Sequence, residues 1–568
     1  MIKKILTTLT LVLIFLASSY SLLHRGFFHV HDFTHAARIA EMASALRDGQ
    51  LPVRWSANFG FGFGMPLFNF YAPLPYFVGA LFLQLGFTAV ASLKILYLLS
   101  NFLTLWGAYL LGKKLFGRAG ALLLTAAYTL APYRAVNLFV RGALSEAWAM
   151  AFLPFVLWGI IAFIQTKQKK YLLVLLSALA AIILSHNLTA LMFIPLSALF
   201  VFVYLLREKQ IKLIWQFIPT YILAFALTAF YVLPALLEKD LTIIEQIFAG
   251  YFHYANHFLY IRQFFQDNWQ YGGSAWGPDD GISFFLGKGQ LLGLLALFYL
   301  AGRLLWQKSK TFIQSKAFFF LVFFSLATLL SLFLSLQRSF FIWEKFEFLQ
   351  YIQFPWRFLA VANFFLALLL GASSYLIRNN YYRYAYASFL LFFLFFNLSF
   401  FKPKAYLDDP SGLYYVEPQR ISAEMSEILP DYIPKQMVEQ EILQSEGQKR
   451  PEFWLEKSHA DDKLELMFAN GFSKLLLTEL REESLLNFKV AYFAGWQAEI
   501  DGEVQEIIIN PELGNIQLLV PAGSHKVAIY FSEATLPRQL GDSLSVIAII
   551  ITLYFFSPFA KVANKPKD

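Results

Sequence analysis

Long apolar runs, each close to the length of one membrane-crossing helix, follow one another along most of the chain. A helix needs about 20 apolar residues to cross the hydrocarbon core of a bilayer. Short groups of Lys and Arg separate the runs, so the pattern predicts an all-α polytopic membrane protein with about twelve transmembrane helices. The predicted crossings are 5–23, 90–112, 119–133, 147–165, 171–185, 190–206, 213–236, 290–306, 317–336, 358–377, 385–401 and 541–558.

The pattern changes before the last run. From about residue 450 to 535, charged residues become frequent and apolar residues alternate with polar ones. Alternation predicts strands with one buried face, and Asp501-Gly502 is typical of a two-residue hairpin turn. We therefore expect a small antiparallel β-sandwich, preceded over 402–450 by helical or irregular chain. The predicted division is a membrane module at 1–401, a soluble domain at 402–540, and a final transmembrane helix with a basic tail at 541–568.

Composition agrees with a membrane protein. Hydrophobic residues make up 58% of the 568 residues and charged residues only 15%, whereas soluble proteins average about 25% charged residues. The net charge of +8 follows from basic loops on one side of a membrane, so we expect no nucleic-acid partner. Cysteine is absent, which excludes disulfides, thiol nucleophiles and thiolate metal sites.

The basic clusters predict the orientation. Lys3 and Lys4 precede the first run, and further clusters follow every second run, which puts both termini in the cytoplasm. The first run could be a signal peptide, but its length favours an uncleaved helix. The outer segments are then 24–89, 134–146, 185–189, 237–289, 337–357 and 402–540. If the apolar stretch 70–86 were a crossing, every later basic cluster would lie on the outer side of the membrane. We therefore interpret this stretch as a helix on or in the outer leaflet.

Candidate chemistry begins directly after the first run, in HVHDFTHAARIAEMASALRDGQLPVRW. The spacing of its apolar residues predicts an amphipathic helix on the outer surface, beginning near Asp32. Asp32 could be the helix N-cap, a general base or a metal ligand, and the first role is compatible with the others. His31 and His35 are four residues apart and could share a zinc ion, although no H-E-x-x-H motif is present. A divalent cation such as Mg²⁺ or Mn²⁺, held with Asp32, is a further possibility. Hydrogen bonds from these histidines to phosphate or sugar are the alternative.

Other outer segments carry similar residues. Arg141 and Glu146 both precede the predicted crossing at 147–165, where the helix dipole alone could explain an acid. His186 and Asn187 form either a plain turn or the lining of a cavity. Trp356 and Arg357, in QYIQFPWRF, could be interfacial anchors or a grip for a lipid phosphate. The loop FGFGFGMP lacks the strand and helix of a phosphate-binding loop, so we expect it to insert its aromatic side chains at the membrane interface.

These stretches resemble a known family. HDFTHAARIAEMASALRDGQLPVRW, FGFGMPLFNFYAPLPY, APYRAVNLFVRGALSE, LSHNLTAL, FYVLPALLE and QFPWRF resemble the bacterial membrane family called 6-pyruvoyl-tetrahydropterin synthase-related. YFAGWQAEIDGE and PAGSHKVAIYF resemble the end of YfhO-type membrane proteins. The family's label does not imply pterin chemistry, because no soluble synthase domain is visible. Both groups are similar to the GT-C class of glycosyltransferases.

The resemblance implies a GT-C-like fold in the bacterial cytoplasmic membrane, with the site and the soluble domain outside. It implies transfer of a sugar from a polyprenyl-phosphate donor to a cell-envelope glycan, lipid or protein. Asp32 takes the position of the first family acid and Glu146 that of the second. The candidate substrate-binding residues are His31, His35, Arg54, Arg141, His186, Asn187, Trp356 and Arg357. Some members carry D-x-D where this chain has a lone Asp32, so metal dependence stays open.

The rival hypothesis is a transporter, flippase or assembly factor for lipid-linked glycans. A transporter typically has ionisable residues in the middle of several crossings and an internal repeat, and this chain has few of the former and no convincing repeat. Convergence of Asp32, Arg141 and Arg357 in one outer cleft would favour the transferase. Separate positions would favour the rival.

Overall fold

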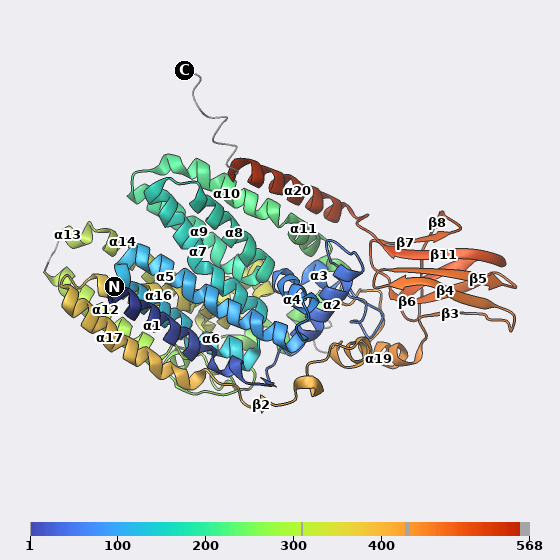
Figure 1. Ribbon diagram of the computed structural model, residues 1–568, viewed down its shortest axis with the longest axis horizontal. Coiled ribbons are helices and arrows are strands. Elements are labelled where there is room, and N and C mark those ends of the chain that lie inside the picture. Colours follow the sequence, from blue (N-terminus) through green and yellow to red (C-terminus); the bar gives the residue numbers. More distant parts are fainter. Residues whose placement is uncertain (1, 308–309, 427–431, 557–568) are drawn as a thin grey trace, which may run out of the picture.

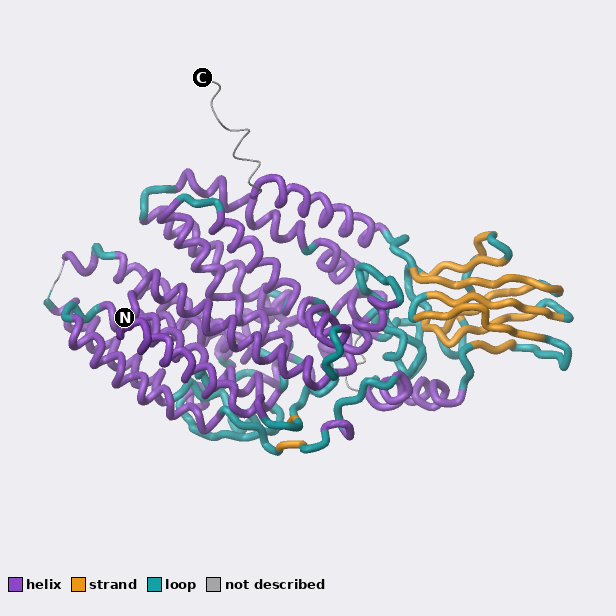
Figure 2. Tube along the Cα trace, viewed as in Figure 1, coloured by secondary structure: helices purple, strands orange, loops and turns teal. Residues whose placement is uncertain are grey.

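A bundle of long helices and a β-sandwich that projects from one of its ends make up the protein (Figure 1). The computed structural model describes residues 2–307, 310–426 and 432–556. We call the end of the bundle next to the sandwich the sandwich end, and the opposite one the far end. Helices and strands are almost completely segregated between the two parts (Figure 2). The long bundle helices are α1 (Ile2–Ser19), α5 (Ala89–Thr129), α7 (Leu144–Thr166), α8 (Lys170–Ser185), α9 (Asn187–Arg207), α10 (Ile214–Leu227), α11 (Ala229–Leu237), α12 (Lys288–Trp306), α14 (Lys316–Ser335), α16 (Leu359–Tyr375), α17 (Asn380–Phe395) and α20 (Leu536–Phe556).

Within the described residues, nine helices are long and apolar enough to cross a membrane, or ten if α10 and α11, bent by 70°, form one crossing. Helix α5 contains two of the predicted crossings. At Gly117 its φ is 73°, and a Cβ on Gly112 would lie only 2.7 Å from the Cα of Ala121. In a straight helix those residues would stand about 13 Å apart, so the chain reverses at Gly117. The predicted crossing at 171–185 is α8, which has 16 residues. The end of the last predicted crossing and the basic tail, from residue 557 onward, lie outside the described residues.

Two short helices lie at the sandwich end. Helix α4 (Leu74–Gln84) has 11 residues, which at 1.5 Å per residue is too short to cross a bilayer. Helix α2 (His35–Arg47) is where the sequence predicts an amphipathic surface helix, but its polar residues Arg38 and Glu41 are buried as well as its apolar ones. The N-cap residue is Thr34, so the interpretation of Asp32 as the helix cap is wrong.

The C-terminal strands form the predicted antiparallel sandwich. One sheet has the order β3-β6-β10-β9 and the other β4-β5-β11-β7-β8, and all neighbouring strands are antiparallel. Asp501 and Gly502 both have positive φ, 53° and 88°, as a type I′ hairpin turn requires. The strands are β3 (Phe453–Leu455), β4 (Lys463–Asn470), β5 (Ser473–Leu480), β6 (Ser484–Ala491), β7 (Trp496–Ile500), β8 (Glu503–Gln505), β9 (Ile508–Ile509), β10 (Asn515–Val520) and β11 (Gly523–Phe531).

The segment between α2 and α4 joins the bundle to the sandwich. The backbone N–H of Phe61 donates to Ser426 Oγ at 2.8 Å, and the N–H of Ala491 donates to the carbonyl oxygen of Phe63 at 2.7 Å. Both phenylalanines are buried. The loop packs against the C-terminal part of the chain. The expectation that it inserts its aromatic side chains into the membrane interface is therefore wrong.

Candidate functional site

A cavity of about 490 Å³ opens at the sandwich end of the bundle. Seven of the ten residues selected from the sequence line it, although they come from four separate segments of the chain. They are His31, Asp32, Arg141, His186, Asn187, Trp356 and Arg357. The volume lies within the range typical of small-ligand sites, so the cavity has room for a sugar with its phosphate.

Asp32 is positioned by backbone pairing between the loop before α2 and the loop before α7. Its N–H donates to the carbonyl oxygen of Arg141 at 2.8 Å, and the N–H of His31 donates to Val140 at 3.1 Å. The approach requires Gly142, where a Cβ would lie 2.4 Å from a methyl carbon of Val30. The half-buried Asp32 carboxylate makes no hydrogen bond or ion pair with any residue that the structure describes, and it is therefore available to a ligand.

Arg141 lies at the end of a π-helical turn, Asn137–Arg141, and Glu146 stands in the first turn of α7. Arg141 Nη1 donates to Glu146 Oε2 at 2.7 Å and to Asn137 Oδ1 at 2.6 Å. The other carboxylate oxygen of Glu146 accepts from Tyr133 at 2.7 Å and from Asn137 at 3.1 Å. Glu146 is buried and does not line the cavity. Both of its oxygens have partners, and one of them holds the guanidinium of Arg141.

The segment before α16 supplies the second arginine. Arg357 Nη1 donates to the carbonyl oxygen of Ile352 at 2.7 Å and to Gln353 Oε1 at 3.2 Å, while its Nε is buried without a partner among the described residues. Gln353 has φ 59° and ψ −47°, a conformation that is rare for residues other than glycine. Such backbone geometry is concentrated at functional sites.

Trp356 is held by a chain of hydrogen bonds that the sequence did not predict. The guanidinium of Arg141 stands 4.6 Å from its ring centroid, and Trp356 Nε1 donates to Ser274 Oγ at 3.1 Å. His257 Nδ1 lies 2.7 Å from the same oxygen, and His257 Nε2 lies 2.5 Å from the carbonyl oxygen of Tyr251. That carbonyl must accept from Nε2, so the Ser274 hydroxyl donates to Nδ1. The loop 242–287 lacks a periodic pattern, and only the Gly272-Gly273-Ser274 sequence could have signalled a close approach of its backbone.

His186 occupies the break between α8 and α9. Its Nδ1 accepts from the N–H of Thr189 at 3.3 Å and lies 2.8 Å from the Thr189 hydroxyl, so it caps α9. Burial lowers the pKa of His186 to about 3, and the ring is therefore neutral at physiological pH. Asn187 is exposed beside it and lines the cavity.

His35 and Arg54 lie outside the cavity lining. His35 Nδ1 lies 2.8 Å from the Tyr76 hydroxyl and Nε2 lies 2.8 Å from the carbonyl oxygen of Gly142, so both ring nitrogens are occupied. Arg54 Nε donates to Glu533 at 2.6 Å and Nη2 donates to Asp542 at 2.9 Å. His35 thus supports the loop before α7, and Arg54 joins the base of the sandwich to the bundle.

The residues present do not fit the divalent cation considered from the sequence. His35 has no free nitrogen, and His31 Nε2 lies 3.0 Å from the carbonyl oxygen of Tyr271. Among the residues that the structure describes, no three His, Asp or Glu side chains are grouped closely enough to hold a metal ion. Asp32 would be the sole acidic ligand from the proposed set.

Aromatic side chains complete the walls. Tyr71 lines the cavity, and its ring centroid is 4.2 Å from the buried guanidinium of Arg38. Phe70 stacks on Tyr432 with ring centroids 5.6 Å apart, and both also line the cavity. Because Tyr432 belongs to the segment between the bundle and the sandwich, the C-terminal part of the chain contributes to the site. Flat aromatic faces of this kind pack well against sugar rings.

Comparison with solved structures returns the arabinofuranosyltransferase AftD from mycobacteria, with a TM-score of 0.46 at 15% identity, covering 71% of this chain and 27% of that one. A mutant of the same protein gives 0.43 at 15% identity, with 71% and 28% covered. An uncharacterized protein of Lactococcus lactis subsp. cremoris (strain MG1363) is 27% identical over 277 residues, or 46% of this chain. The match spans 43% of that relative, which is less than half of its length.

A family model described as "6-pyruvoyl-tetrahydropterin synthase related domain; membrane protein" matches residues 68–400. The matched region includes most of the bundle. It also includes five of the seven lining residues that were selected from the sequence: Arg141, His186, Asn187, Trp356 and Arg357. It covers more than half of the chain and confirms the resemblance inferred from the sequence. The protein therefore belongs to the membrane-protein family described as 6-pyruvoyl-tetrahydropterin synthase related.

Proposed function

We propose that this protein is a membrane glycosyltransferase, which moves a sugar from a polyprenyl-phosphate donor to an acceptor outside the cytoplasm. One observation carries the proposal: a carboxylate without a partner among the described residues, Asp32, shares a single cavity with two arginines, Arg141 and Arg357. Glycosyl transfer needs a base for the acceptor hydroxyl and positive charge for the departing phosphate. The same convergence argues against the transporter, flippase or assembly-factor alternative.

In the proposed reaction, Asp32 takes the proton from the acceptor hydroxyl while that oxygen attacks the anomeric carbon of the donor sugar. The bond between the anomeric carbon and the phosphate oxygen breaks, and its electron pair stays on the phosphate. Arg141 and Arg357 stabilise the charge that develops there. Glu146 and Trp356 hold Arg141 in place, and the proton on Asp32 passes to water after product release.

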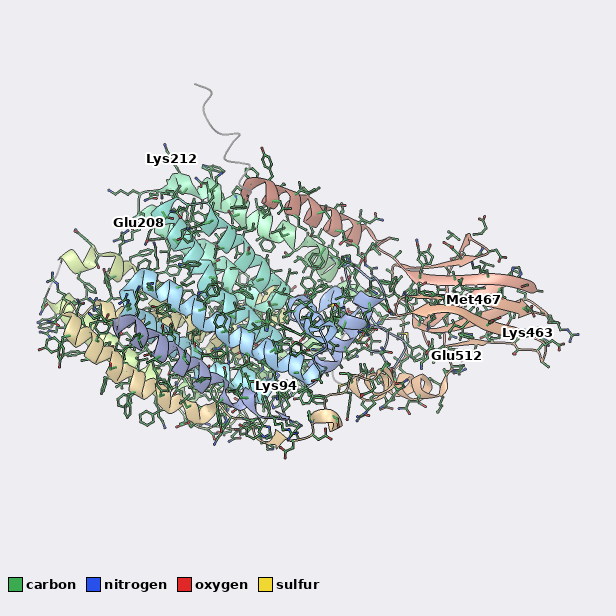
Figure 3. All side chains as sticks on the ribbon, viewed as in Figure 1. Lys94, Glu208, Lys212, Lys463, Met467 and Glu512 are labelled. Carbon is green, nitrogen blue, oxygen red and sulfur yellow. The ribbon has the colours of Figure 1, made fainter. Side chains whose placement is uncertain are left out.

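The predicted orientation supports an acceptor on the outer side. Basic residues gather at the far end, where Lys316 pairs with Glu208 at 2.5 Å and Lys212 lies nearby on the chain (Figure 3). Under the positive-inside rule that end faces the cytoplasm, which puts the cavity and the sandwich outside. Cell-envelope glycans, lipids and proteins are all accessible there, and the lipid-linked donor would enter from the surrounding membrane.

The test is incubation of the purified protein with a panel of polyprenyl-phosphate sugars, with measurement of the released lipid phosphate. Asp32→Asn should lower transfer by about 10²–10⁴-fold, the usual contribution of a general base, while donor binding persists. Asp240→Asn is the matched control, because Asp240 is exposed and does not line the cavity. Full transfer by the Asp32 variant would refute the base assignment, and failure of the wild type with every donor would refute the transferase.

A further inference from the structure

A second cavity, of about 750 Å³, lies on the side of the bundle between α8, α10 and α20. Its walls are almost entirely apolar and include Trp215, Leu223, Ala226, Leu544 and Ile551. Among the described residues that line it, Lys169 is the one with a charged side chain. We call this cavity the lateral groove.

The lateral groove has the dimensions of one bilayer leaflet. Lys169 and Trp215 stand before α8 and at the start of α10, and Phe555 lies near the close of α20. From Leu544 to Phe555 the helix rises about 17 Å at 1.5 Å per residue. Half of a hydrocarbon core of about 30 Å is about 15 Å. Along α20 the groove is therefore about as long as one leaflet is thick.

Helix α20 packs on the bundle through small residues, the last of which is the buried Ala548. Ser545 Oγ accepts from the N–H of Phe230 at 2.9 Å and donates to the carbonyl oxygen of Ala226 at 3.1 Å, and Gly541 lies directly against Ala229. Beyond them, Ile547 is 51% and Ile551 38% exposed. The second half of α20 thus leaves an apolar trough beside α8, and in a membrane an acyl chain fills such a space.

Lys169 is the charged residue among the described residues that line the groove, and its ammonium is available at the mouth. Its neighbour Lys167 donates to the carbonyl oxygen of Ile164 at 2.5 Å, and the ammonium of Lys170 stands 5.2 Å from the ring centroid of Tyr171. The ammonium of the exposed Lys169 makes no hydrogen bond or ion pair with another described residue. Its ammonium is complementary to a phosphate group at the membrane surface.

We propose that the lateral groove binds an anionic phospholipid, with one acyl chain against α10 and α20 and the phosphate at Lys169. The bound chain fills the gap between α8 and α20 and so holds the last helix, which carries the sandwich at its other end, against the bundle. This inference is independent of the catalytic proposal, because the lateral groove shares no lining residue with the cavity at the sandwich end.

The test is native mass spectrometry of the full chain in detergent, with phosphatidylglycerol or phosphatidylcholine of identical acyl chains. We expect preferential retention of phosphatidylglycerol. Lys169→Gln should lower that retention about fivefold, the factor that corresponds to about 1 kcal/mol for one lysine at an anionic surface. Lys170→Gln is the matched control and should retain the lipid as the wild type does.

A second pair of variants tests the position of the acyl chain. Ile547→Trp narrows the groove and should reduce retention, whereas Val546→Trp, at a neighbouring exposed position outside the lining, should not. Equal retention of both lipids by the wild type, or equal effects within either pair of variants, would overturn the proposal. Retention that begins only after deletion of residues 557–568 would assign the groove to the chain's own C-terminus, and would overturn it as well.

Discussion

Replacing Glu146 with Gln tests whether the cavity depends on an oriented arginine. The substitution preserves the size of the side chain and removes its charge. The oxygen that accepts from Arg141 Nη1 at 2.7 Å can become an amide NH₂, which would put a donor against a donor. If the amide is flipped, the same conflict arises with Tyr133 and Asn137, which now donate to the other oxygen. In either rotamer at least one buried donor loses its acceptor.

The magnitude follows from the burial of the pair. The side chain of Glu146 is 1% exposed and that of Arg141 is 10% exposed. Breaking a buried ion pair by removing one partner costs about 3–5 kcal/mol. Arg141 borders the cavity, where water can reach it, and Gln keeps one acceptor, so we expect about 3 kcal/mol. If the whole loss falls on the orientation of Arg141 in the transition state, transfer drops about 100-fold, at about 1.4 kcal/mol for each factor of ten.

The assay is release of lipid phosphate from the active donor, measured together with thermal unfolding in detergent. Glu41→Gln is the matched control, because Glu41 is also a buried carboxylate at the sandwich end. Its partners are neutral: Ser56 Oγ donates to it at 2.6 Å and Asn58 Nδ2 at 2.6 Å. This variant should lose stability and keep its activity. Wild-type transfer by the Glu146 variant, or an equal loss of transfer in both, would refute the positioning role.

Two further predictions concern the surroundings of the cavity. Ser274→Ala removes the hydrogen-bond link between Trp356 and His257 and should lower transfer about tenfold, from a loss of about 1–2 kcal/mol; unchanged kinetics would show that Trp356 needs no such support. Burial, followed by the charge of Arg38, lowers the pKa of His35 to about 4, whereas the unfolded chain takes up this proton near pH 6.5. Stability should therefore be complete above about pH 6.5 and fall by up to about 3 kcal/mol towards pH 4; thermal unfolding of His35→Gln should show a shallower fall, and an identical slope would contradict the assignment.

The architecture could be predicted from the sequence wherever a single physical requirement determines an element. Apolar length alone identifies the crossings, and alternation identifies the strands. The prediction failed at α2, because the periodic pattern shows an apolar face but does not show that Arg38 and Glu41, on the polar face, are also buried. The burial of that face depends on the loop and the sandwich that cover it. Those contacts join residues hundreds of positions apart, as in the bond from Phe61 to Ser426.

The candidate site was predictable where polar residues stand at helix ends next to apolar runs. Asp32, Arg141 and Arg357 all meet that description, and they share one cavity. Arg54 stands at no helix end, and its side chain turns towards Glu533 and Asp542, which lie beyond the sandwich in the sequence. No local pattern could reveal those partners. The support of Trp356 by Ser274 was not predicted for a related reason, because Ser274 lies in a loop without a periodic pattern.

The ionic cluster around Arg54 also explains how the sandwich is held next to a site in the bundle. Arg538 donates to Glu238 at 3.0 Å, and the same carboxylate oxygen accepts from Asn69 at 2.8 Å. Asn69 directly precedes Phe70, which lines the cavity. The Arg538 and Glu238 side chains are 0% and 4% exposed, so separating them would cost several kcal/mol. Arg538 also donates to the carbonyl oxygen of Ala494 at 2.8 Å, at the base of the sandwich, so the same buried pair fixes the sandwich next to the bundle and Phe70 next to the cavity.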